Sequence, residues 1–417
     1  MRLSLAAWIC LAGVSVLSAD TVLKTGNLTA DARVIALVNN DGNESVNALG
    51  IGANAFYDHT INENYRLGVG IAFGAPLSES DDGIAAQQLN VELSESGKSS
   101  DFFSLNQFYL HYLQSQYDVK IGRVVLDTPL AASDDHWRLN KNSFEAVVGS
   151  YKVSESFHAL AAYIRSFSGI DSTALNSNGS TARDDFNSMS DAAFGVLGYN
   201  KDQVDNAGVM TLAALYGEEA LKTQGWLYYM PEIEAGGLKT SLTAFYGDLD
   251  WVSPMGRKGE LSVSLQAYHI GLSKDFDTAT HNVGGLKVTM TSLADMLDFT
   301  AALNMVSGDG AIMNLWGAYP EYAAGSEVFL TGLSEGMVAK LGARMNMESL
   351  LENAILDLNV IMLDGDMSDY GPDSSALFGE IVLAYAPDKQ WDTSLTIVTR
   401  SGDAEGYKAL AKAAYAF

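Results

Sequence analysis

Long segments in which apolar and polar residues alternate constrain this chain more than any other feature. Every second residue from Met337 to Met347 is apolar, and the positions between them include Lys340 and Arg344. Alternation of period two places the two sets of side chains on opposite faces of a β-strand. The alternating segments run for about 10 to 13 residues, near the 9–11 residues of a tilted transmembrane strand and longer than the usual 5–6 of soluble strands.

The same segments predict a closed barrel. After residue 20 the sequence has no run of about 20 apolar residues, the length that a transmembrane helix needs. Strands can cross a bilayer only when the sheet closes and pairs every backbone group. The sequence therefore predicts an all-β fold: a transmembrane antiparallel up-and-down β-barrel of the porin type, formed as a single domain by residues 20–417. A large soluble β-sandwich or β-helix is the alternative, although its strands are usually shorter.

The strand count is close to that of known porins. We count nineteen candidate strands, one of them at 191–200. Single-chain bacterial barrels have even numbers of strands, so one strand is spurious or missed. The long connections are expected to face the cell exterior. Strand directions assigned on this basis from the N-terminus and from the C-terminus disagree somewhere between residues 200 and 335. We predict about 18 strands, and 16 or 20 stay open.

The first residues read as an export signal. Arg2 is followed by an uncharged apolar stretch and then by Ser18 and Ala19. This order is that of a secretory signal peptide at 1–19, cleaved after Ser18 or Ala19. A membrane anchor is the alternative, but the apolar stretch is short for a span. Cys10, the one cysteine of the chain, lies inside this segment. The mature protein therefore has no cysteine, which fits a bacterial envelope better than an animal extracellular space.

Charge and motifs exclude several function classes. Lys and Arg number 25 and Asp and Glu number 51, so the formal net charge of −26 excludes nucleic acid as a partner. None of the six histidines has metal-ligand spacing, and no nucleophile, base and orienting group are evident, so we predict no enzyme. No cofactor is predicted. Acidic stretches such as 79–82, Asp309 and 364–366 are compatible with Ca²⁺, but solvated charge explains them better.

Charged residues fall on the polar face of several predicted strands. A mixed charge on that face implies a water-filled lumen, which barrels of 16–18 strands provide. The residues predicted to line the pore on this basis are Arg33, Arg66, Lys120, Lys340, Arg344, Glu380 and Arg400.

The last segment resembles the signal by which outer-membrane barrels are recognised for assembly. From Tyr407 to Phe417 every second residue is Ala or aromatic, and the segment ends on Phe417. This resemblance implies outer-membrane lipid and the barrel assembly machinery of a Gram-negative bacterium as partners. Whether three barrels pack together as a homotrimer stays open.

One further region resembles a known family. Lys120–Arg123, Leu126–Leu130, Ser133–Asp135, Arg138 and Asn142–Glu145 are similar to the strand and third loop of the Opr family. That family contains the OprD-like channels and the related major outer-membrane porins of epsilonproteobacteria. The resemblance implies that the loop at 125–142 folds into the barrel and narrows the pore. An ordinary external loop is the alternative.

The predicted function follows from the barrel and this loop. We expect a porin for passive diffusion of ions and small hydrophilic solutes, with a constriction formed by Asp127, Asp134, Asp135, Arg138 and Lys141. These five residues carry one excess negative charge, which predicts a weak preference for cations. The alternative is a substrate-specific OprD-like channel for amino acids, peptides or carboxylates. A barrel enzyme or a surface adhesin is a more remote alternative.

Overall fold

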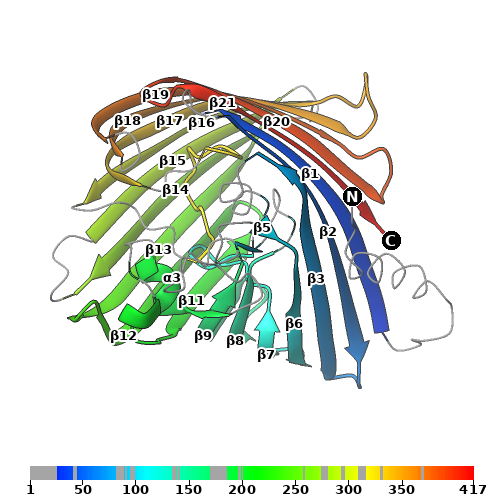
Figure 1. Cartoon of the computed structure of the whole chain (residues 1–417), viewed down its shortest axis with the longest axis vertical. Helices are drawn as coiled ribbons and strands as arrows, with labels where there is room; N and C mark the ends of the chain where they lie inside the picture. The colour runs from blue at the N-terminus through cyan, green and yellow to red at the C-terminus, as the bar shows by residue number, and fades with distance from the viewer. Residues whose placement is uncertain are drawn as a thin grey trace.

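The structure, a computed structural model, is a barrel of long antiparallel strands (Figure 1). The parts of the chain that the structure describes are residues 26–40, 45–80, 89, 92–93, 99–133, 139, 141–169, 186–195, 199, 201–256, 259–273, 280–292, 296–308, 316–328, 332–367 and 371–417. The predicted signal peptide at 1–19 lies outside these residues. No helix among them is long and apolar enough to cross a membrane.

Eighteen strands form the wall. The first nine are β1 (Gly26–Asn40), β2 (Ser45–Thr60), β3 (Tyr65–Glu79), β6 (Phe102–Leu113), β7 (Tyr117–Val124), β8 (Ser143–Lys152), β9 (Phe157–Ser168), β11 (Val209–Glu218) and β12 (Leu221–Ala235). The others are β13 (Leu238–Met255), β14 (Gly259–Leu272), β15 (Thr280–Ser292), β16 (Leu297–Gly308), β17 (Leu333–Asn346), β18 (Ala354–Met367), β19 (Gly371–Tyr385), β20 (Trp391–Gly402) and β21 (Gly406–Ala416).

Each wall strand pairs with the next, and β21 pairs with β1 to close the ring. Ala36 lies opposite Ala411, and the Phe417 N–H donates to the Ala30 carbonyl at 2.9 Å. Three short strands lie outside this ring order: β4 (Glu92–Leu93), β5 (Ser99–Ser100) and β10 (Asn187–Ser188), which pairs with β9. The predicted all-β barrel of about 18 strands is confirmed.

The candidate strand at 191–200 is wrong. Its first residues belong to a helix, α3 (Met189–Gly195), which a 3-10 turn, η1 (Lys201–Gln203), follows. The Asp191 N–H donates to Ser188 Oγ at 3.0 Å and the Ser188 N–H donates to Asp191 Oδ2 at 3.2 Å, the reciprocal bonds of a capping box. The surplus strand therefore lay just before residue 200, outside the interval of 200–335 that the loop lengths indicated.

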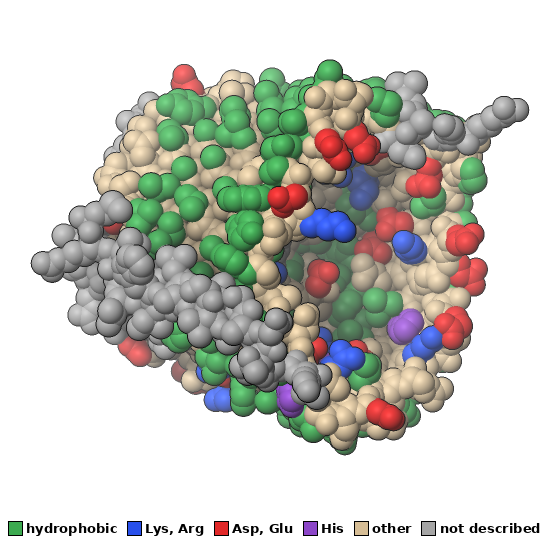
Figure 2. All heavy atoms as spheres, turned by 90° about the vertical axis from the view of Figure 1, so that its right-hand side faces the viewer, with side chains coloured by type: hydrophobic (Ala, Val, Ile, Leu, Met, Phe, Trp, Pro, Cys, Tyr) green, Lys and Arg blue, Asp and Glu red, His purple; other side chains and the backbone are tan. Residues whose placement is uncertain are grey.

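The two faces of the wall differ as the alternation predicts. Leu341 is 67% exposed on the outer face of β17, whereas Lys340 and Arg344 point inward. Figure 2 shows the same contrast from the side of Figure 1 that carries the C-terminus: apolar side chains cover much of the outer wall, and charged side chains and a histidine line the hollow. An apolar outer band around a polar interior is the arrangement of outer-membrane barrels.

Candidate channel constriction

A tight hairpin leaves the wall after β7. The Ser133 N–H donates to the Leu126 carbonyl at 2.7 Å, and the Leu126 N–H donates to Ser133 Oγ at 3.0 Å. Nearer the tip, the Thr128 N–H and hydroxyl both donate to the Ala131 carbonyl, at 3.1 and 2.8 Å. These local bonds satisfy the backbone of a segment that has left the sheet. We call residues 126–133 the lumen hairpin.

The tip of the lumen hairpin reaches a distant part of the wall. Leu130 is buried, and its N–H donates to the hydroxyl of Tyr228 on β12 at 3.4 Å. Tyr228 is fully buried and packs against the Trp316 ring, 6.2 Å between centroids. Burial of these apolar surfaces removes them from the water of the lumen and fixes the tip. The hairpin therefore lies inside the barrel.

Further along the same connection, Leu139 contacts a different part of the wall. It is fully buried beside β2, where Asn54 Nδ2 donates to the Leu139 carbonyl at 3.5 Å. A Cβ at Gly52 would lie 3.0 Å from the Leu139 carbonyl oxygen, so the glycine permits this close approach. Within 125–142, the described residues thus contact β12 through Leu130 and β2 through Leu139.

A second segment, residues 316–328, also lies inside the barrel. We call it the wall segment because it follows the inner faces of β14 to β21. At its start, the Ala132 N–H of the lumen hairpin donates to the Trp316 carbonyl at 3.1 Å, and Trp316 Nε1 donates to the Met189 carbonyl of α3 at 2.9 Å. Farther on, Gln266 Nε2 of β14 donates to the Pro320 carbonyl at 2.6 Å.

Buried polar side chains hold the rest of the wall segment. Tyr268 donates to Glu321 Oε1 at 2.5 Å, and Lys340 Nζ donates to the Ala324 carbonyl at 2.6 Å. Glu327, whose side chain has no exposed surface, forms an ion pair with Lys408 of β21. Burial raises the pKa of Glu321 above its usual 4.5.

Glu380 of β19 accepts four hydrogen bonds, three of them from the wall segment. Its Oε1 accepts the Ser326 N–H at 2.8 Å, the Ser326 hydroxyl at 2.7 Å and the Glu327 N–H at 3.0 Å, while Oε2 accepts Asn359 Nδ2 at 2.9 Å. A Cβ at Gly325 would lie 2.9 Å from Glu380 Oε1, so only glycine lets the backbone pass so near. Four donors around one carboxylate satisfy a charge that is 1% exposed.

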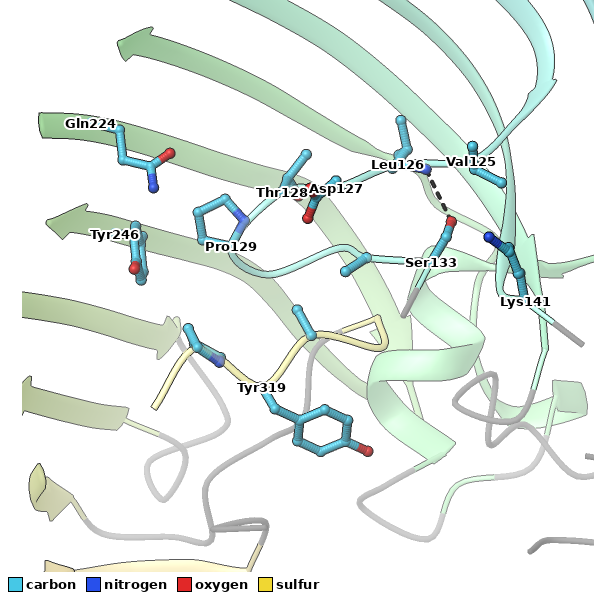
Figure 3. A pocket seen from close by; sticks show the side chains of 13 residues that line it. Val125, Leu126, Asp127, Thr128, Pro129, Ser133, Lys141, Gln224, Tyr246 and Tyr319 are labelled. Carbon is cyan, nitrogen blue, oxygen red and sulfur yellow. Dashed lines mark hydrogen bonds between the residues drawn. The ribbon is translucent and has the colours of Figure 1, made fainter. Parts of the chain in front are cut away.

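A cavity of about 700 Å³ lies between the two segments (Figure 3). Gln224 and Tyr246 face it from β12 and β13, Asp127 and Pro129 from the lumen hairpin, and Tyr319 from the wall segment. The full lining is Val125, Leu126, Asp127, Thr128, Pro129, Ala132, Ser133, Lys141, Gln224, Tyr246, Ala318, Tyr319 and Pro320. The lining offers a carboxylate, an ammonium group, an amide and phenol groups to a solute.

The structure describes two of the five predicted constriction residues. Asp127 and Lys141 both line the cavity. Asp134, Asp135 and Arg138 lie outside the described residues. The excess negative charge predicted for the constriction therefore depends on three residues whose positions the structure does not describe.

The predicted pore-lining residues on strands fall into two groups. Arg33 pairs with Asp31 at 2.5 Å, Arg66 with Asp58 at 3.5 Å and Arg344 with Asp357 at 2.8 Å. Arg400 donates to Asn39, and Lys120 lies 5.5 Å from the centre of the Tyr109 ring. These five residues are on the inner face of the wall.

Lys340 and Glu380 also point inward, but they hold the wall segment instead of facing an open pore. Glu380 is a correction to the prediction, because its carboxylate is buried under residues 325–327. Nothing near Glu380 in the sequence indicates its partners Ser326 and Glu327, which lie 53–54 positions away. The cavity residues Gln224, Tyr246 and Tyr319 were also missed, although Gln224 and Tyr246 alternate in phase with the inward face of β12 and β13.

Metal-binding groups are not evident in the part of the chain that the structure describes. No cluster of three or more His, Cys, Asp or Glu side chains there is arranged to hold a metal ion. Asp81, Asp82 and Asp309, from the acidic stretches considered for Ca²⁺, lie outside that part.

Sequence comparisons give no family. No protein-family model matches the chain, and no curated protein matches it.

Solved structures do match it, over nearly the whole length of both chains. OccAB4 of Acinetobacter baumannii superposes with a TM-score of 0.74 at 12% identity, covering 96% of this chain and 100% of the other. OpdK of Pseudomonas aeruginosa, solved with vanillate, gives 0.72 at 13% identity, covering 95% and 99%. A BenF-like porin from Pseudomonas fluorescens Pf-5 gives 0.74 at 12% identity, covering 95% and 99%.

OpdK is an outer membrane protein and the BenF-like protein is a porin, which agrees with the predicted location in the outer membrane. Nothing in the comparisons bears on the resemblance to porins of epsilonproteobacteria. The protein has the closed 18-strand fold of the outer-membrane porins that it resembles.

Proposed function

We propose that the chain forms a water-filled channel for passive diffusion of ions and small hydrophilic solutes across the outer membrane of a Gram-negative bacterium. The cavity between the lumen hairpin and the wall segment carries this proposal, because it is a space of about 700 Å³ lined in part by polar side chains, inside a barrel with enough strands to leave room for water. No covalent step is required. Selectivity would come from the width of this passage and the charges on it.

The experiment is conductance in planar bilayers of the full, refolded chain. We expect stable unitary currents that rise linearly with salt concentration, and a reversal potential slightly in favour of cations. Uptake of uncharged sugars into liposomes should rise linearly with sugar concentration. A folded barrel that inserts without conducting would exclude the proposal.

A substrate-specific channel is the second candidate. The cavity offers Lys141 as a cation, Gln224 as an amide and Tyr246 as a ring, the groups that would bind a carboxylate with an apolar body. The OpdK structure was solved with vanillate, an aromatic carboxylate. Saturation of the current or of uptake by one carboxylate, and its loss in Lys141→Gln, would favour this candidate over general diffusion.

We further propose outer-membrane lipid and the barrel assembly machinery as partners of the folded and the folding chain. Assembly into a homotrimer is an open part of this proposal, and cross-linking of the protein in native membranes tests it.

A further inference from the structure

Two arginines depart from the inward orientation that most basic residues of the wall share. Wall-strand Lys and Arg side chains that point into the lumen include Arg33, Arg66, Lys120, Lys287, Lys340, Arg344, Arg400, Lys408 and Lys412. Arg123 instead follows the outward phase of Ile121 on β7, and Arg165 lies beside the outward Tyr163 on β9. Charge on the outer face of a barrel is costly unless it lies near the membrane surface or has a partner.

One carboxylate holds the two arginines together. Glu145 of β8 lies between them: its Oε1 is 3.2 Å from Arg123 Nε, and its Oε2 is 3.9 Å from Arg165 Nη1. The Ser166 hydroxyl also donates to Glu145 Oε2 at 2.8 Å. The cluster of Arg123, Glu145 and Arg165 therefore has a net charge of +1 on a chain whose formal charge is −26.

Local contacts fix each of the two arginines on the outer face. The pairing of β8 with β9 shifts between Glu145 and Ala146, so Arg165 is the extra residue of a β-bulge. Bulges re-aim side chains, and the Arg165 side chain is 76% exposed. Arg123 is fixed by the Phe186 ring, 4.1 Å from its guanidinium carbon, and by a bond of 3.0 Å from Nη1 to the Leu105 carbonyl.

The cluster lies near the strand ends at one rim of the barrel. All three of its charged residues are within three positions of the strand ends at which the long connections emerge. Phe108, opposite Arg123 in the β6–β7 ladder, and Tyr163 are exposed on the outer face. Aromatic side chains of this kind mark the boundary between hydrocarbon and headgroups.

We propose that Arg123 and Arg165 bind the phosphate group of a lipid in the surrounding membrane leaflet. Arginine pairs with phosphate through charge-assisted bonds, and the neighbouring aromatic rings would contact the acyl chain of the same lipid. Glu145 orients the two guanidinium groups and limits the affinity by repelling the phosphate. The inference rests on the proposed membrane location, but not on conduction of solutes.

The test is lipid binding to the full, refolded chain in detergent, measured by native mass spectrometry with diphosphoryl lipid A and with the same lipid after removal of its phosphates. Binding should require the phosphates. Arg165→Gln should weaken it roughly tenfold, the loss expected for one or two charge-assisted bonds. Lys239→Gln, on β13 at the same end of the barrel, is the matched control and should bind as the wild type does.

Glu145→Gln separates lipid binding from a structural role. Removing the carboxylate should strengthen binding of the phosphorylated lipid, whereas a purely structural cluster would lose affinity or show no change. Equal binding of the dephosphorylated lipid, or unchanged binding in Arg165→Gln, would overturn the proposal. An affinity for inorganic phosphate alone that equals the affinity for the phosphorylated lipid would also overturn it. Heat-modifiable migration on gels shows that each variant is folded, and conductance tests the proposed function independently.

Discussion

The lumen hairpin at 126–133 and the wall segment at 316–328 both lie inside the barrel, but different interactions hold them. The hairpin is closed by its own backbone and hydroxyl bonds, and its apolar tip at Leu130 packs against Tyr228. The wall segment has few bonds of its own. Charged side chains of three wall strands hold it: Lys340, Glu380 and Lys408.

The difference shows which charges remain available to a solute. Glu380 and the Glu327–Lys408 pair are buried by the wall segment, so they contribute to its attachment and little to the cavity. Asp127 and Lys141 are held by the hairpin connection and face the cavity. Inward alternation alone therefore does not identify pore-lining residues, because some inward charges bind loops.

The largest expected effect comes from breaking the buried pair. Lys408→Met leaves the Glu327 carboxylate buried without its cation, which should destabilise the protein by about 3–5 kcal/mol. Urea unfolding of the refolded barrel measures this loss, and single-channel conductance should rise as the wall segment leaves the wall. The double variant Lys408→Met with Glu327→Gln should recover much of the stability. No recovery would mean that the pair does not act as a unit.

The next largest effect tests which face of β17 points outward and which points into the lumen. Leu341→Arg places a charge on the outer face and should cost about 2–4 kcal/mol near the bilayer midplane. Arg344→Leu, its matched control three residues away, removes only a half-exposed ion pair with Asp357 and should cost about 0–1 kcal/mol. Reversible unfolding in lipid vesicles ranks the two. The opposite ranking would reverse the two faces of β17.

A smaller effect, in the pH dependence of stability, distinguishes the wall segment from the lumen hairpin. Because burial raises the pKa of Glu321, protonated Glu321 favours the bound wall segment, and this contribution is lost as pH rises through the raised pKa. Stability should therefore fall more steeply with rising pH above 4.5 in the wild type than in Glu321→Gln. Thermal unfolding across this range gives the two slopes. Parallel curves would show that Glu321 does not ionise on unfolding.

The smallest effect belongs to the hairpin tip. Tyr228→Phe removes the acceptor of the Leu130 N–H but keeps the ring, so the free energy of unfolding should fall by about 0.5–1.5 kcal/mol. Conductance should stay as in the wild type, since the local bonds of the hairpin remain. If Tyr228→Phe destabilised as strongly as Lys408→Met, the contrast between the two segments would not hold.

Much of the wall could be predicted from the sequence, because alternation is a local signal. The outward phase of Leu341 and the inward phase of Arg344 follow directly from period two. The error at 191–200 has a local cause as well. Apolar residues at 192–194 suit a strand, but the capping bonds between Ser188 and Asp191 start a helix there. The spacing from Ser188 to Asp191 was a signal that the count overlooked.

The interior was harder to predict, because its contacts join residues far apart in the chain. Asp127 was found through a resemblance that covers one local region, and the structure places it in the cavity lining. Glu380 was assigned to the open pore because nothing near it in the sequence indicates Ser326 as its partner. Gln224 and Tyr246 have the inward phase of their strands, but alternation does not say which inward residues a loop leaves uncovered.

Access of a reagent to the cavity tests the central claim most directly, since Cys10 is the chain's one cysteine and is easily removed. In a Cys10→Ala background, Asp127→Cys places a thiol in the cavity lining, and Ser401→Cys places one on the exposed surface near the end of β20 as a control. A cationic methanethiosulfonate reagent added during recording should reduce the single-channel current of Asp127→Cys by more than half and leave the control unchanged. An unchanged current through Asp127→Cys channels that mass spectrometry shows to be fully labelled would contradict the account, because the cavity between the two segments would then not be the path of conduction.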